Sequence, residues 1–198
     1  NAWTQLGADI DGEAAGDLSG WSVSLSSDGG VLAVGAIRND GSSSSASDNG
    51  HVRVYKYLNN AWTQLGADID GEAAGDLSGW SVSLSSDGGV LAVGAVDNDG
   101  SSSGSNRGHV RVYKYNVSND NAWTQLGADI DGEAAGDLSG WSVSLSSDGG
   151  VLAVGAVDND GSSSGSNRGH VRVYKYNVSN DNAWTQLGAD IDGEAAGD

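Results

Sequence analysis

Carboxylate side chains recur at short spacing along the chain, and they are the residues best suited to bind a metal ion. Four acids fall within residues 68–76, and residues 97–100 read Asp-Asn-Asp-Gly. Ca²⁺ takes six to eight oxygen ligands, which Gly-containing turns can supply. The sequence therefore predicts calcium sites. Their ligands would be Asp68, Asp70, Glu72, Asp76, Asp97 and Asp99, with copies at Asp129, Asp131, Glu133, Asp137, Asp158 and Asp160.

A second interpretation of these acids needs no metal ion. Neither segment is a complete EF-hand loop, and Arg38 replaces the counterpart of Asp97 in the first copy. Asp-Gly pairs are also common in ordinary surface turns, because both residues tolerate turn conformations. Both interpretations, as calcium ligands and as solvated turns, remain open for these positions.

Each unit contains a single histidine, His51, His109 or His170, which could act as a general base for a Ser hydroxyl. Each stands at the start of an expected strand, and the sequence places no acid behind it as a catalytic triad requires. Near-identical units also offer the same groups everywhere, whereas catalysis needs different groups in different roles. We therefore expect half-exposed histidines packed on tyrosine, and no enzyme activity.

Aromatic and amide side chains suggest two further kinds of site. Trp80 alternates with Val82 and Leu84, so we expect it in the core, whereas Trp62 has polar neighbours and could either pack or hold a sugar. Asn116 and Asn177 begin Asn-Val-Ser triplets in expected loops. These match the acceptor pattern for N-glycosylation, which applies to a secreted eukaryotic protein.

The elements that must position these residues repeat along the chain. Residues 61–121 are identical to residues 122–182, and residues 2–60 differ from them only in two loops. We divide the chain into repeats at residues 1–60, 61–121 and 122–182, followed by a partial fourth repeat at residues 183–198. One such unit cannot bury its own apolar face, so neighbouring units must build the core together.

Four short strands are expected in each of the three full repeats and one in the partial fourth repeat, which makes thirteen in the chain. Residues 79–85 and 109–115 alternate between apolar and polar, residues 90–96 are apolar almost throughout, and residues 122–126 form the fourth strand. The Asp-Gly-Gly at residues 87–89 favours a hairpin. The pattern predicts an all-β fold of tandem four-stranded antiparallel blades, as in a β-propeller, with a β-solenoid as the alternative.

Three motifs in each repeat resemble the FG-GAP repeat of integrin α-subunit β-propellers and related surface proteins. They are GWSV at residues 79–82, LAVGA at residues 91–95 and GHVRVY at residues 108–113. The Phe of the family pattern is Ser78 here, and its Pro is Val96. Its Asp-rich calcium loop is reduced to residues 86–89. The resemblance implies the propeller fold but no calcium site at that hairpin.

Composition narrows the class of function. The formal charge of -18 argues against nucleic acids and anionic membranes, because basic patches supply the affinity for both. No disulfide can form without Cys, and no apolar run approaches the length of a membrane helix. No signal peptide is recognisable in the sequence.

These observations lead to an expected function. We expect a non-enzymatic, extracellular or cell-surface scaffold for structural assembly or adhesion. The alternative is a multivalent propeller module that binds a glycan or a surface protein. Closed propellers have about four to eight blades, so three repeats cannot close a ring, and we expect the chain to associate with itself through its edges.

Overall fold

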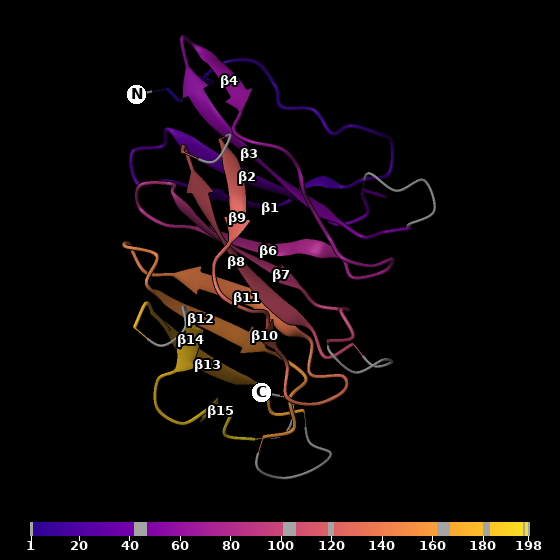
Figure 1. The fold of residues 1–198 in the computed structure, drawn as a ribbon. Coiled ribbons are helices and arrows are strands. Elements are labelled where there is room, and N and C mark those ends of the chain that lie inside the picture. The colour runs from indigo at the N-terminus through magenta and orange to yellow at the C-terminus, as the bar shows by residue number, and fades with distance from the viewer. Residues whose placement is uncertain are drawn as a thin grey trace.

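The computed structural model describes residues 2–41, 47–100, 106–118, 121–161, 167–179, 183–195 and 197. Within these ranges the chain forms fifteen strands and no helix, arranged as three sheets that follow one another through the molecule (Figure 1). The strands are β1 (Ser19–Leu25), β2 (Val31–Ala36), β3 (His51–Leu58), β4 (Ala61–Gln64), β5 (Ile69–Asp70), β6 (Ser78–Leu84), β7 (Val90–Ala95), β8 (His109–Asn116), β9 (Ala122–Gln125), β10 (Ile130–Asp131), β11 (Ser139–Leu145), β12 (Val151–Ala156), β13 (His170–Asn177), β14 (Ala183–Gln186) and β15 (Ile191–Asp192).

Each sheet is four strands wide and antiparallel. The first runs β1-β2-β3-β4, and the two-residue strand β5 pairs with the other end of β3. The second and third sheets repeat this order with β6 to β10 and β11 to β15. The all-β prediction is confirmed, and the β-solenoid alternative is wrong, because every strand pairs antiparallel within its own sheet. None of the described residues forms a helix that could span a membrane.

The fourth strand of each sheet comes from the sequence repeat that follows. β4 returns along β3 through a tight turn in which Asn59 and Asn60 have positive φ angles of 51° and 63°, as hairpin turns of this kind require. Residues 2–5 have the same sequence as β4 and form no strand, and Trp3 is fully exposed. Among the described residues β4 pairs with β3, and residues 2–5 pair with no strand, so the pairing partner and not the local sequence decides where this strand forms.

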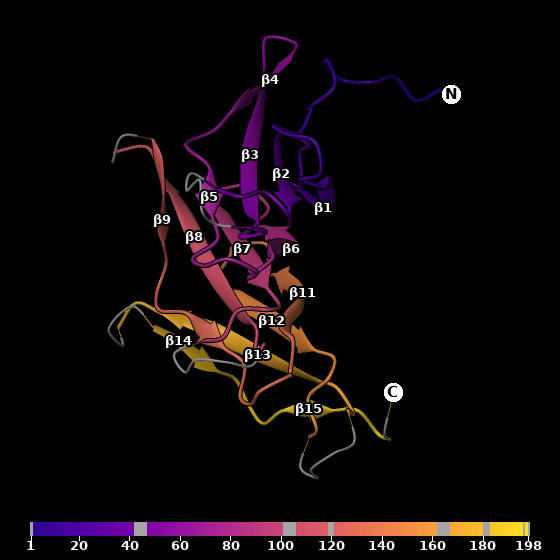
Figure 2. The ribbon, with the colours of Figure 1, turned by 90° about the vertical axis from the view of Figure 1, so that its right-hand side faces the viewer.

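The core lies between the sheets. Val31, Ala33, Val52 and Val54 of the first sheet pack against Leu84, Leu91 and Val93 of the second, and a second cluster joins the second and third sheets in the same way. The prediction that neighbouring units build the core is confirmed. Seen from the side, β1, β6 and β11 lie close together, while β4, β9 and β14 spread apart like part of a fan (Figure 2).

The innermost strands approach one another closely. A Cβ on Gly94 would clash with the carbonyl oxygen of Gly140, which accepts a 2.7 Å hydrogen bond from Ser81 Oγ. Trp80 stacks between Trp21 and Trp141, at ring separations of 5.1 and 4.8 Å.

The prediction that Trp80 lies in the core is wrong, since its side chain is only partly buried. A register shift between Ser78 and Ser81 explains the error. It interrupts the period-two alternation on which the prediction depended.

Candidate functional site

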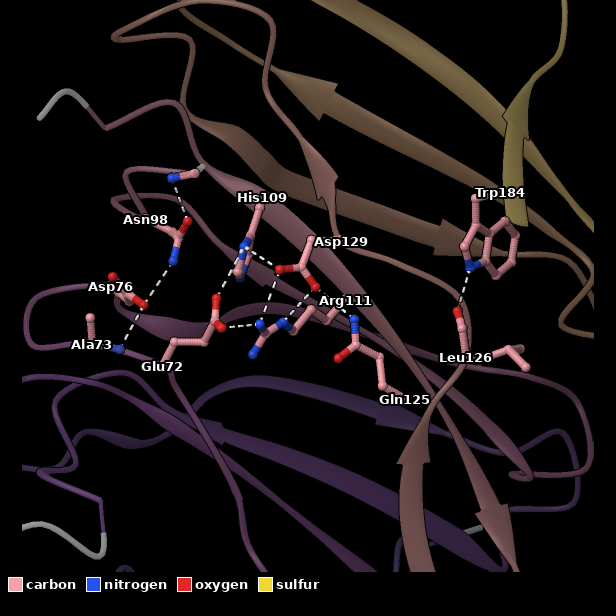
Figure 3. A network of polar contacts seen from close by, with 11 residues as sticks. Glu72, Ala73, Asp76, Asn98, His109, Arg111, Gln125, Leu126, Asp129 and Trp184 are labelled. Carbon is pink, nitrogen blue, oxygen red and sulfur yellow. Dashed lines mark hydrogen bonds and ion pairs between the residues drawn. The ribbon is translucent and has the colours of Figure 1, made fainter. Parts of the chain in front are cut away.

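Three clusters each bring together one histidine and one glutamate of a repeat and one aspartate of the repeat that follows. In the middle copy Glu72 lies in the link between the first and second sheets, His109 opens β8, and Asp129 lies just before β10 (Figure 3). Their possible ligand atoms lie within 4.8 Å of one another. The same arrangement recurs twice. The other copies are Glu13, His51 and Asp68, and Glu133, His170 and Asp190.

The histidine is the most buried member of this cluster. The His109 side chain is 5% exposed, and its Nδ1 makes no hydrogen bond, although Glu72 Oε2 and Asp129 Oδ2 lie 3.9 and 4.0 Å away. Burial, reinforced by nearby Arg111, lowers the pKa of His109. The imidazole is therefore neutral at pH 7. The expectation of half-exposed histidines was wrong, because the links before β6 and β10 cover the ring.

Arg111 holds the two carboxylates of the middle copy. It donates hydrogen bonds from Nε to Asp129 Oδ1 at 2.8 Å and from Nη2 to Oδ2 at 3.0 Å, and it forms an ion pair with Glu72. Burial alone would raise the pKa of Asp129, but the hydrogen bonds and charge of Arg111 keep it below its ordinary value. The arginine thus fixes both carboxylates while one oxygen of each still faces the imidazole.

The structure does not bring the four acids of residues 68–76 to one site. Asp68 joins His51 of the first sheet, Asp70 lies in β5, and Glu72 joins His109 of the second sheet. Asp76 is buried, and its Oδ2 accepts hydrogen bonds from Ala73 N at 3.0 Å and Asn98 Nδ2 at 2.9 Å. The chain crosses from one sheet to the next within this segment, so neighbours in sequence separate in space.

The second predicted calcium segment is organised by Asn106. Its side-chain nitrogen donates to Asp97 Oδ1 at 3.1 Å, and its backbone N–H donates to Asp99 Oδ1 at 3.2 Å. Burial, with a smaller contribution from Asp76, raises the pKa of Asp97. Asp97 thus lies near the buried Asp76, and Asn106 links it to Asp99.

Copies of both segments do meet in the third repeat. They line a hollow of about 390 Å³ whose polar residues are Glu133, Asp137, Asp158, Asn159, Asp160 and Asn167. Asp131, another predicted ligand, lies in β10, and its carbonyl oxygen accepts a hydrogen bond from Arg172 at 3.2 Å. Calcium binding stays a prediction.

The glycosylation candidates lie at strand ends and not in loops. Asn116 and Asn177 are the exposed last residues of β8 and β13. Their side-chain oxygens accept hydrogen bonds at 3.0 Å from the backbone N–H groups of Ser118 and Ser179. Both side chains are therefore accessible at the start of a turn.

Three equivalent hollows, which the sequence did not reveal, lie where neighbouring segments meet. Their volumes are about 270, 250 and 250 Å³, and each is lined by one Tyr, one Trp and two Asp. In the second of them, Asp68 and Asp70 face Tyr113 and Trp123 of the next sheet. The tyrosines of these hollows pair across the sheet with Gln and not with the Trp of the same hollow, so the spacing of Tyr and Trp along the sequence did not indicate them.

The tryptophans of β4, β9 and β14 also join one segment to the next. Trp123 Nε1 donates to Leu65 O at 2.8 Å, and Trp184 Nε1 donates to Leu126 O at 2.7 Å. Trp62 makes the same bond to Leu6 O at 2.9 Å. This role explains why Trp62 has polar sequence neighbours and yet packs.

The two end sheets each expose one half of the interface that is buried inside the molecule. On the first sheet Val23 is 62% exposed, together with Leu25, whereas Leu84, the counterpart of Leu25, is 7% exposed. On the third sheet Ile191 is 60% exposed, whereas its counterparts Ile69 and Ile130 are 6% exposed. We call these surfaces the leading face (Trp21, Val23 and Leu25) and the trailing face (Val151, Ala153, Val171, Val173 and Ile191).

A hollow of about 360 Å³ lies beside the trailing face and is lined by Gly155, Gly169 and Gly193. The counterparts of these glycines in the second sheet, Gly94, Gly108 and Gly132, contact residues 138–140 of the third. The hollow thus corresponds to the place that the start of a following sheet fills elsewhere in the molecule. The leading face offers that start, at residues 18–20.

Comparison with known proteins places this fold. No protein-family model matches the chain, and no curated protein sequence does. Among solved structures it resembles a candidate 6-phosphogluconolactonase from Bacteroides uniformis (14% identity, TM-score 0.56) over 89% of this chain and 41% of that one. It also resembles Saccharomyces cerevisiae Sqt1 (14% identity, TM-score 0.54) over 91% of this chain and 37% of that one.

Both are β-propeller proteins, and this chain spans less than half the length of either. At this identity the likeness concerns the fold alone. The three sheets match partial propeller blades, which confirms the predicted blade architecture.

Proposed function

We propose that the protein is a non-enzymatic extracellular scaffold that assembles head to tail, the trailing face of one copy binding the leading face of another. The motifs at residues 79–82, 91–95 and 108–113 support an FG-GAP-type surface protein as its class. The observation that carries the proposal is the complementarity of the two end faces. The same contacts are already made twice inside the chain, between its first and second and its second and third sheets.

Geometry favours a closed assembly of few copies. Because the two faces differ, the contact is heterologous, and it forms a ring if the rotation closes and a fibre if it does not. Two copies would supply six blades, within the range of closed propellers. The same faces would receive further repeats where a longer chain supplies them.

The test measures the self-association of a variant in which one of the two faces is disrupted. Val23→Asp places a charge on the leading face, at a site exposed in the single chain. A buried unpaired carboxylate is costly, so we expect association to weaken at least about a hundredfold. Light scattering and sedimentation over a dilution series measure this.

The matched control is Val117→Asp, which changes another exposed valine, in the turn after β8 and in neither of the two faces. It should associate like the parent chain. Parent protein that stays monomeric at every concentration, or equal effects of both substitutions, would contradict the proposal.

The three equivalent hollows favour a second candidate function, a multivalent module that binds carbohydrate. Their Tyr and Trp rings offer apolar surface and their aspartates offer hydrogen-bond acceptors, the combination found in small-ligand sites. Repetition would add avidity. Glycan-array binding that Tyr55→Ala, Tyr113→Ala and Tyr174→Ala together remove, with association unchanged, would favour this candidate over the scaffold.

A further inference from the structure

We propose that each of the three clusters binds one divalent transition-metal ion, best matched by zinc, between the histidine Nδ1 and the glutamate of one repeat and the aspartate of the next. The middle site is formed by Glu72, His109 and Asp129 (Figure 3). The ion is distinct from the predicted calcium, since its ligands include a nitrogen and come from three separate segments.

The distances are close to those that a bound ion requires. The histidine Nδ1 lies 3.8, 3.9 and 3.9 Å from the glutamate Oε2 in the three repeats. Zinc bonds to N and O are about 2.0–2.2 Å long, which puts two tetrahedral ligands about 3.3–3.5 Å apart. A closure of about half an ångström is therefore enough. The glutamate side chains can supply it, because they are 42–48% exposed.

The buried imidazole is an independent observation that points to a ligand. All three histidine side chains are at most 5% exposed, and all three Nδ1 atoms lack a hydrogen bond. A buried polar atom left without a partner destabilises the folded state. A metal ion would give each Nδ1 a partner, and the neutral imidazole is the form that binds it.

The donor set selects the kind of ion. Calcium and magnesium prefer oxygen ligands alone, whereas imidazole suits zinc, copper and nickel. Two carboxylates and one neutral imidazole leave a fourth position for water. Arg111 pairs with the same two carboxylates, and the three groups together still carry a net negative charge. The arginine also orients the carboxylates, as outer partners do at metal sites.

The test titrates Zn²⁺ into the full chain by calorimetry, after chelation and at a concentration where the chain is monomeric, and repeats the titration with Co²⁺ by visible absorption. We expect about three ions per chain and a tetrahedral cobalt band. Glu72→Gln should reduce the count to about two, and Glu13→Gln, Glu72→Gln and Glu133→Gln together should abolish binding. His109→Ala should also give about two, and circular dichroism checks that each variant is folded.

Glu194→Gln is the matched control. Glu194 has the same sequence context as Glu133, but it belongs to none of the three clusters among the described residues. This variant should still bind three ions. A chain that binds no Zn²⁺ or Co²⁺, a count unchanged by the glutamate substitutions, or displacement of zinc by an equal concentration of Ca²⁺ would overturn the proposal.

Discussion

The buried histidines couple the folding of the chain to pH. Burial lowers the pKa of His51 and His109, so the unfolded chain, whose histidines titrate near pH 6.5, takes up protons first as the pH falls. The free energy of unfolding should therefore be level above about pH 6.5 and decrease below it. Each histidine contributes at most about 1.4 kcal/mol per pH unit.

Urea unfolding in chelated buffer, between about pH 7.5 and pH 5, measures this dependence. Asp129 does not interfere, because its lowered pKa makes stability fall only at lower pH, near the unfolded value of about 3.9. His109→Gln removes one titrating group and should make the slope shallower. An unchanged slope in this variant would show that His109 is not held neutral.

Close packing between the strands of neighbouring blades requires glycine at certain positions, such as Gly94. Gly94→Ala would push its new methyl group against the carbonyl oxygen of Gly140 on the next sheet. Overpacking of this kind costs about 1–3 kcal/mol. A chain of this size should then melt roughly 2–12 °C lower, since 1 kcal/mol shifts Tm by about 2–4 °C. Differential scanning calorimetry measures the change.

Gly155→Ala is the matched substitution on the third sheet. There the methyl group would meet only Ser142 of its own sheet, whose hydroxyl can rotate away. Its Tm should change less than that of Gly94→Ala, while association through the trailing face should weaken. Equal melting of the two variants would mean that the contact between the inner strands contributes little.

Sequence patterns predicted the strands that follow a period and missed features that depend on pairing. The strands at β6 to β9 agree with the expected ranges to within one residue, because alternation and hairpin glycines are local signals. The two-residue strands β5 and β10 were invisible, since no period fits in two residues. The histidine cluster was also missed, because Glu72, His109 and Asp129 come from segments up to 57 residues apart.

Two segments of the chain compete for one place in the assembly. Residues 6–17 contact the first sheet in the way that residues 65–76 contact the second. Leu6 O accepts a hydrogen bond from Trp62, and Glu13 lies beside His51. In a head-to-tail pair, Leu187 and Glu194 of the other copy would belong at this position. Only one of the two segments can occupy it.

Deleting residues 1–17 should therefore strengthen association, by about tenfold if the released competition amounts to 1.4 kcal/mol. Analytical ultracentrifugation of the parent and the shortened chain measures it. Deleting residues 183–198 as well removes both candidates for the position, together with β14 and with Ile191 of the trailing face, and should cancel the gain. Weaker association after the first deletion would show that residues 1–17 help to hold the copies together.

The stacked tryptophans give assembly an optical signature. Trp21, Trp80 and Trp141 form one row of tilted, touching indoles, and touching indoles couple their electronic transitions. In a pair joined head to tail, Trp141 of one copy would meet Trp21 of the next, so the row would grow from three rings to six and could close on itself. The near-ultraviolet circular dichroism of the tryptophans would then change with protein concentration, so the assembly could be followed without a label.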